Sequence, residues 1–389
     1  MMPRCGRHFL LSVLWIALVR VVPAVAQVPP AVPTPPVPPP TLEEVRREMA
    51  VPSHDDVRGR VDSMGYALRA EQMAKVWELS ASPPEPEALS PSPAPGVAAV
   101  ISPHDDFAFA GRIYRRVLPL ITAKTVVLIG VFHGYRRFQE HDRIVFDAYR
   151  SWSAPDGSIP VSPLREALLA RLPREDWVQS AVAHDAEHSL EPIVAWLRHM
   201  DSDLEIVPII VPAARFERLE QIAGHLGAAL SEEMKARGWA LGREVAIVIS
   251  TDGIHYGPDF KQTLFGAGGV TAYEKATAKD RGLLTGPLKG ALTVSKIRTL
   301  YSTFVDPEHP DNYRWTWCGR FSVPFGLLTL ESLTRGSGGV VGRPLVYGTS
   351  ISAPELPLRD AGMGTTAPSN LYHFVGYPAA AFTLREPAK

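Results

Sequence analysis

Histidines closely follow three short apolar segments that the sequence predicts as buried β-strands. The three are His104, His133 and His255, after Val97–Ser102, Thr125–Val131 and Glu244–Thr251 respectively. Because ligand sites in parallel α/β sheets form outside the carboxyl ends of the strands, we expect these imidazoles to lie at one edge of the sheet. Imidazole is the commonest metal ligand and the usual general base in proteins. The pattern therefore predicts a metal or proton-transfer site at that edge.

A further pair, His184 and His188, is four residues apart, so a helix would place both imidazoles on one face. The spacing invites comparison with the zinc motif H-E-x-x-H. Asp185 rather than a glutamate follows the first histidine, however, and it also suits the N-terminal cap of a helix. The sequence therefore favours a capped helix over a zinc site of that type.

Cys318 is one of two cysteines in the chain and lies in the segment Trp315–Arg320. Two cysteines exclude a disulfide-rich scaffold and a four-cysteine zinc site. A buried free cysteine that packs as a small apolar side chain is one interpretation. The other is a metal ligand, because a thiolate beside two imidazoles would bind copper, iron or zinc.

Short β-rich runs alternate with helical segments along most of the chain. A fourth strand is expected at Leu204–Val211, and the helices at Pro163–Arg171, Glu187–His199, Arg215–Arg237 and Tyr273–Leu284. This alternation predicts a three-layer α/β/α domain with a mostly parallel central sheet. Leu345–Ser352 and Tyr372–Leu384 are expected as late strands that extend or edge the sheet.

The amino terminus has the features of a secretory signal peptide. Arg4 and Arg7 precede the apolar run Phe9–Val19, and Ala24–Ala26 forms a small-x-small cleavage site. The run is shorter than the ~20 residues that span a bilayer, so a retained anchor is the weaker alternative. We expect an exported protein, periplasmic or secreted, without stable membrane insertion after cleavage. The expected parts are residues 1–26, a signal peptide; 27–95, a proline-rich linker and amphipathic preamble with helices near Leu42–Met49 and Ala70–Leu79; and 96–389, the α/β metal-binding domain.

The charge composition argues against a nucleic-acid partner. The chain has 40 lysines and arginines against 41 aspartates and glutamates, which gives a formal net charge of −1. A protein that binds nucleic acid through bulk electrostatics carries a basic excess.

Six motifs, in order, resemble those of the Memo family, also called AmmeMemoRadiSam system protein B, which shares its fold with class III extradiol ring-cleaving dioxygenases. They are Ser102–Gly111, Gly130–Gly134, Glu187–Glu191, Ser250–Gly257, Trp317–Arg320 and Val375–Ala379. The resemblance implies one metal ion, with iron or copper favoured and zinc as a further option. It implies that the metal ligands are His104, His133 and Cys318 and that the catalytic base is His255. Asp252 and His188 would line the same edge of the sheet.

The sequence departs from the family pattern beside the first ligand. Asp105 and Asp106 replace small residues, so an extra carboxylate could join or compete at the metal. Gly134 stands where the family has a second histidine.

The leading functional interpretation is an exported metalloprotein with a His/His/Cys site and redox or dioxygenase-like chemistry, in which His255 moves protons. The second is a non-catalytic module that binds a metal or a peptide. The third is a metal-dependent hydrolase that uses metal-bound water. The sequence does not identify the small-molecule substrate or peptide.

Overall fold

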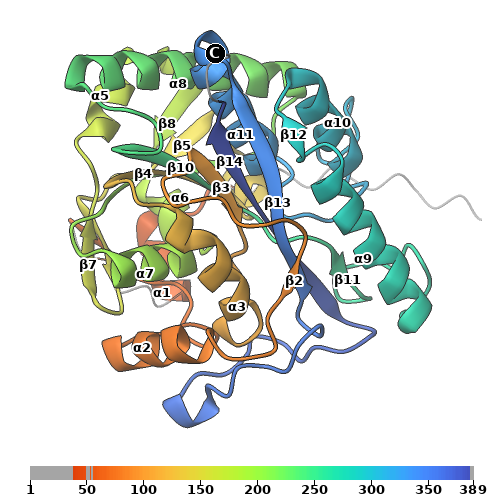
Figure 1. Ribbon diagram of the computed structural model, residues 1–389. Coiled ribbons are helices and arrows are strands. Elements are labelled where there is room, and N and C mark those ends of the chain that lie inside the picture. The colour runs from red at the N-terminus through yellow and green to blue at the C-terminus, as the bar shows by residue number, and fades with distance from the viewer. Residues whose placement is uncertain (1–37, 50–52, 54–55, 386–389) are drawn as a thin grey trace, which may run out of the picture. The chain divides into compact units, whose positions relative to one another are not determined.

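Within the described residues, the centre of the fold is an 11-stranded sheet (Figure 1). The computed structural model describes residues 38–49, 53 and 56–385, which belong to one compact unit of the chain, Pro38–Lys389. The strand order is β12 (Gly290–Ala291), β13 (Val340–Thr349), β14 (Phe374–Leu384), β3 (Ala99–Ser102), β10 (Val245–Ser250), β4 (Thr125–Val131), β9 (Glu205–Val211), β5 (Ile144–Phe146) and β8 (Trp177–Gln179). Two short strands pair beside this path, β11 (His255–Tyr256) with β14 and β2 (Glu87–Ala88) with β13.

The four strands at the centre, β3, β10, β4 and β9, are parallel to one another. The outer strands pair differently, because β14 runs antiparallel to β3 and to β13, and β5 runs antiparallel to β9. No helix of the α type separates β13 from β14, and strands joined without a crossover helix pair in the antiparallel sense. The expected α/β class is confirmed, and the parallel arrangement is confirmed for the centre alone, since the whole sheet is mixed.

Helices flank the sheet (Figure 1). They are α1 (Leu42–Met49), α2 (Ala70–Leu79), α3 (Phe107–Val117), α4 (Tyr135–Phe138), α5 (Leu164–Arg171), α6 (Ala181–Asp185), α7 (Glu191–Met200), α8 (Phe216–Arg237), α9 (Val270–Thr285), α10 (Val294–Phe304) and α11 (Ser322–Thr334), with 3₁₀ turns at Leu118–Leu120, Arg174–Asp176, Arg335–Ser337 and Arg359–Ala361. Among them α2, α3 and α7 pack against one another, while α11 packs against α8, α10 and the central strands.

The central strands are apolar because both faces of the sheet are covered. Every residue of β4 and β10 is buried, as expected for parallel strands between two layers of helices. Burying one valine or isoleucine side chain stabilises a fold by about 1.5–3 kcal/mol, so these strands hold the backbone firmly. The loops after β3, β4 and β10 therefore leave the same edge of the sheet from fixed positions.

The segment before β3, expected from the sequence as a preamble, contacts the α/β domain along much of its length. β1 (Val57–Arg58) pairs with β6 (Ser151–Ala154) in a small sheet that β7 (Gly157–Pro160) completes. Arg58 is fully buried and forms a 2.6 Å ion pair with Glu191 at the start of α7. The guanidinium also donates to the carbonyls of His184 and Glu187, so this segment fixes the loop between α6 and α7.

The expected signal peptide, residues 1–26, lies outside the described residues, as does most of the expected proline-rich linker. Across the part of the chain that the structure describes, no helix combines the length and the apolar character needed to cross a membrane.

Candidate metal centre

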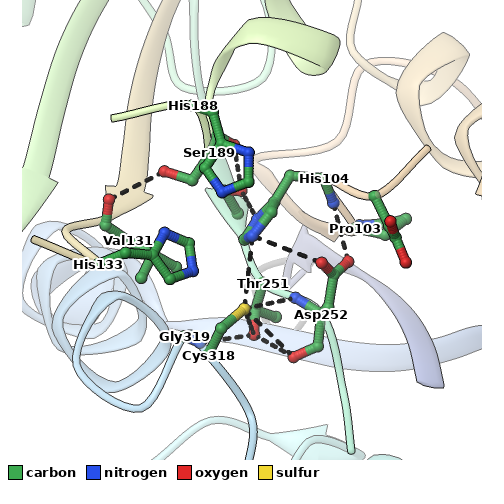
Figure 2. A network of polar contacts seen from close by, with 12 residues as sticks. Pro103, His104, Val131, His133, His188, Ser189, Thr251, Asp252, Cys318 and Gly319 are labelled. Atoms are coloured by element: carbon green, nitrogen blue, oxygen red, sulfur yellow. Dashed lines mark hydrogen bonds and ion pairs between the residues drawn. The ribbon is translucent and has the colours of Figure 1, made fainter. Parts of the chain in front are cut away.

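Histidine, carboxylate and thiol side chains come together from the loops after β3, β4 and β10, the loop between α6 and α7 and the segment before α11. Among the described residues, two groups have ligand atoms within 4.8 Å of one another and share His104. One group is His104, His133 and His188, and the other is His104, Asp252 and Cys318. Figure 2 shows the His104 ring between these two sets of side chains.

The hydrogen bonds of His104 define its tautomer. Its Nδ1 lies 2.6 Å from the hydroxyl of Ser250, and that hydroxyl donates its proton to the carbonyl of Ser189. Because the hydroxyl has one proton, Nδ1 of His104 must be the donor to Ser250. Burial, together with His133 and His188, lowers the pKa of His104 well below its usual value. His104 is therefore a neutral imidazole whose Nε2 lone pair faces the cluster.

His133 is held by Glu187 on the loop between α6 and α7. The carboxylate accepts from Nδ1 of His133 at 2.9 Å and from its backbone N–H at 2.6 Å. The same carboxylate accepts from the backbone N–H groups of His188 and Ser189. Burial alone would raise the pKa of Glu187, but His133 and these donors hold it well below its usual range. An ionised carboxylate is an acceptor, so Nδ1 of His133 carries the proton of this hydrogen bond.

His188 has the same arrangement with a carboxylate from the amino-terminal segment. Its Nδ1 lies 2.5 Å from Asp62. Burial would lower the pKa of His188, but the hydrogen bond and charge of Asp62 raise it to about 10. Metal ligands of this type donate their second ring N–H to a carboxylate, a carbonyl or water, which fixes the tautomer and the ring orientation.

Cys318 and Asp252 complete the second group below His104. The thiol sulfur lies 3.5 Å from Nε2 of His104 and accepts the backbone N–H of Asp252 at 3.0 Å. A carboxyl oxygen of Asp252 lies 3.4 Å from the same Nε2. Burial and the adjacent Asp252 raise the pKa of the Cys318 thiol well above its usual value. A thiolate would therefore require a positive charge at this position, which a metal ion supplies.

His255 lies beside the cluster without joining either group. Its Nδ1 lies 3.0 Å from the carbonyl of Gly253 and 3.2 Å from that of Thr316. Since carbonyls accept, Nδ1 carries the proton and Nε2 has the lone pair. Burial lowers the pKa of His255, so this imidazole is neutral and able to accept a proton.

A cleft of about 280 Å³ opens above the histidines. Its floor includes His104, His133, His188, Asp252 and His255. Its walls come from the loop before α2, the start of α3 and the loop between β13 and β14. The cleft gives a small molecule access to the imidazoles.

Every residue predicted for the site lies at this edge, in the cleft or directly beneath it. They are His104, His133, His188, Asp252 and His255 in the cleft lining, and Cys318 buried behind His104. The structure groups His133 with His104 and His188, and Cys318 with His104 and Asp252. The specific ligand set His104, His133 and Cys318 stays a prediction. Asp105 lines the cleft, whereas Asp106 is buried and bonds to Thr366.

Asp62 is a site residue that the sequence did not reveal. It lies more than forty residues before the first ligand, and no local motif surrounds it. Only the tertiary contact of the amino-terminal segment with the loop between α6 and α7 brings it to His188.

Asp280 on α9 is a second residue that sequence reasoning missed. It is fully buried, and one carboxyl oxygen accepts the indole N–H groups of Trp315 and Trp317 at 2.8 and 2.7 Å. The other oxygen accepts the backbone N–H of Ile254 and the hydroxyl of Tyr347, both at 2.9 Å. Asp280 thus ties the segment that carries Cys318 to the segment that carries His255.

His184, the other member of the histidine pair, lies outside both groups. It is fully buried in α6, and its Nε2 donates to the carbonyl of Val145 at 3.1 Å. Nδ1 has no hydrogen-bond partner among the described residues. Burial lowers the pKa of His184 to about 3, so the folded protein keeps this ring neutral.

The His184→Gln variant is expected to lose less stability in acid than the wild type. Between about pH 6.5 and 3 the unfolded chain protonates His184 and the folded chain does not. Stability therefore falls with falling pH, by about 1.4 kcal/mol per unit for this group. Urea unfolding at pH 7 and 4.5 should show a drop about 2–3 kcal/mol smaller in the variant. Parallel pH profiles for the two proteins would contradict this assignment.

Comparison with known proteins identifies relatives of this chain. A family model described as "Memo-like protein" matches residues 65–347, more than half of the chain. A "MEMO1 family protein" of Archaeoglobus fulgidus is 30% identical over 165 residues, 42% of this chain and 57% of the relative. One from Thermococcus kodakarensis is 26% identical over 258 residues, 65% of this chain and 80% of the relative. The chain spans about half the length of the Archaeoglobus relative and of one from Caldivirga maquilingensis (54%). The matched region contains His104, His133, His188, Asp252, His255 and Cys318, and on this evidence the chain belongs to the Memo-like protein family.

Proposed function

We propose that the protein binds one metal ion at His104, with iron or copper favoured over zinc, and performs redox or dioxygenase-like chemistry on a small molecule in the cleft. The observation that carries this proposal is the direction of the three imidazoles. His104, His133 and His188 each have Nδ1 hydrogen-bonded to a protein acceptor, and one ring nitrogen of each lies within 4.8 Å of the others. Metal binding would displace the second ring proton of His188.

The donor set suits a first-row transition metal. Neutral imidazole nitrogens bind iron, copper and zinc, and a thiolate from Cys318 would favour the softer ions among them. Magnesium and calcium prefer ligand sets made of oxygen alone, whereas each group of this cluster contains an imidazole nitrogen. The hydrogen-bond acceptors behind the rings are the usual outer contacts of metal-binding histidines. The residues present therefore fit such an ion.

A bound iron or copper ion would supply one-electron and Lewis-acid chemistry at the floor of the cleft. The chain's own contribution is to orient a small molecule against His104 and to move its proton. His255 lines the cleft as a neutral imidazole whose Nδ1 is held by two carbonyls. Its Nε2 is the atom that would accept a proton from the substrate.

Export to the periplasm or the medium is part of the same proposal. It rests on the order of the basic residues, the apolar run Phe9–Val19 and the small residues Ala24–Ala26. Amino-terminal sequencing of the protein recovered outside the cytoplasm tests it, and a mature chain that starts at Gln27 is the expected result.

Metal analysis of the purified protein tests the main proposal. We expect close to one equivalent of iron or copper per chain, and oxygen consumption with small catechols or thiols. A Cys318→Ser variant distinguishes the two groups. If the variant no longer binds the ion, the sulfur is one of the ligands. If the variant still binds the ion, the ligands are the three histidines. Protein that binds none of iron, copper or zinc would refute the proposal, and a bound ion without oxygen consumption would favour a non-catalytic binding module.

A further inference from the structure

The cleft lining includes both carboxyl groups and histidines. Asp62, Asp105 and Asp252 are among its lining residues, and no lysine or arginine is. A carboxylate on a cleft wall attracts ligands of opposite charge when no basic side chain already pairs with it. The charge of the lining therefore bears on which small molecules can enter.

Two of the three carboxyl groups already have a partner among the histidines. Asp62 bonds to His188, and Asp252 lies against His104. Asp105 is different, because its carboxylate bonds to Tyr377 and Asp106 and to no histidine. One of its oxygens accepts the hydroxyl of Tyr377 at 2.6 Å, and the other accepts the backbone N–H of Asp106 at 2.7 Å.

These contacts fix the Asp105 carboxylate and leave part of it free. An ionised carboxylate has about four acceptor positions, and Tyr377 and Asp106 occupy two. The hydroxyl of Tyr114 also holds the backbone carbonyl of Asp105, at 2.8 Å. Asp105 is half-buried on the cleft wall. It is thus a preorganised acceptor whose remaining positions are open to a ligand.

Aromatic side chains form the apolar part of the same wall. Tyr66, Phe109 and Phe260 all line the cleft. The edges and faces of such rings bury an apolar body, and their faces also attract cations. A volume of about 280 Å³ limits the ligand to a small molecule.

We propose that the ligand of this cleft is a small primary amine with an aromatic or apolar body, whose ammonium group is bound by the Asp105 carboxylate. This inference names the substrate class of the proposed function and rests on the same cleft. The ammonium donates to the open positions of Asp105, and the apolar body lies along Tyr66, Phe109 and Phe260. Asp105 is thereby a specificity residue, placed beside the metal cluster rather than in it.

Calorimetric titration with three probes of shared skeleton tests the proposal. The probes are 2-phenylethylamine, its neutral isostere 2-phenylethanol, and the anion 3-phenylpropanoate. We expect the amine to bind roughly 10- to 100-fold more tightly than the alcohol, the range of a charge-assisted hydrogen bond. The anion should bind most weakly in chelator-treated protein, where no ion can attract it.

The Asp105→Asn variant should remove the preference for the amine and leave the affinity for the alcohol unchanged. Asparagine keeps the size of the side chain and an oxygen that can accept from Tyr377. Asp360→Asn, at an exposed site outside the cleft lining, is the matched control and should behave as wild type. Equal affinities for amine and alcohol, or an unchanged preference in Asp105→Asn, would overturn the proposal.

The same titrations separate this inference from the proposed function. In chelator-treated protein the amine preference should persist, whatever metal analysis finds in the purified protein. An amine that bound the metal directly would lose affinity when the metal is removed and keep it in Asp105→Asn. That result would overturn the role of Asp105 and leave the metal proposal standing.

Discussion

The His104→Ala variant is expected to lose metal binding, with affinity for copper or iron reduced more than 100-fold. Residues that merely orient a metal ligand already contribute 10- to 100-fold to affinity, and His104 is the residue that both ligand groups share. Its removal leaves two imidazoles in one group and a carboxyl and a thiol in the other. Neither remainder has three ligands.

Competition with a chromophoric chelator measures this loss, and urea unfolding shows whether the variant remains folded. His225→Ala is the matched control. Its imidazole lies on α8, is 41% exposed and bonds to Asp176 rather than to the cluster. Wild-type affinity in His104→Ala would show that the cluster does not hold the ion.

Single variants in each group then locate the ion. His188→Ala removes a ligand from the three-histidine group, and Cys318→Ser removes one from the group with Asp252. If the three histidines hold the ion, His188→Ala should approach the effect of His104→Ala while Cys318→Ser stays near wild type. The reverse order would assign the ion to the sulfur group.

The position of this site was predictable because buried parallel strands have a distinctive sequence. Thr125–Val131 is an uninterrupted apolar run, and its predicted bounds agree with β4. Once three such strands are recognised, the topology directs their carboxyl ends to one edge. His104, His133 and His255 therefore come together although up to 151 residues separate them in the chain.

The edges of the sheet and the role of the amino-terminal segment were not predictable in the same way. Strand direction depends on how the chain connects, and the late pair β13 and β14 has no intervening helix to mark a crossover. The helices Leu42–Met49 and Ala70–Leu79 were predicted with the correct bounds. The polar residues between them were not interpretable, because Arg58 and Asp62 find their partners more than 120 residues away.

α3 also escaped prediction, although it begins three residues after His104. Aromatic residues and Gly111 make Phe107–Val117 a weak helix former by intrinsic propensity. Burial overrides this preference, because eight of its residues are buried, Phe107 and Tyr114 completely. The buried residues Phe107, Ala110, Tyr114 and Val117 do recur at the helical period, so this signal was present in the sequence although the intrinsic propensity is weak.

The Asp280→Ala variant is expected to lower the free energy of unfolding by about 3–5 kcal/mol, because it leaves several buried hydrogen-bond donors without an acceptor. The carboxylate has four donors and no neighbouring cation bonded to it among the described residues. Without it, the indoles of Trp315 and Trp317 keep buried N–H groups that lack an acceptor. Each unsatisfied donor costs about 1–3 kcal/mol, and the costs of neighbours are not additive.

Urea unfolding of chelator-treated protein measures this change without a contribution from bound metal. Glu274→Ala, at an exposed position on the same helix, should change stability by less than about 0.5 kcal/mol. Asp280→Asn keeps one acceptor oxygen, so its loss of stability should lie between those of Asp280→Ala and Glu274→Ala. Because the lost bonds position the segments of Cys318 and His255, folded Asp280→Asn should also bind metal more weakly. Unchanged stability in Asp280→Ala would mean that the two segments are held by the surrounding apolar packing alone.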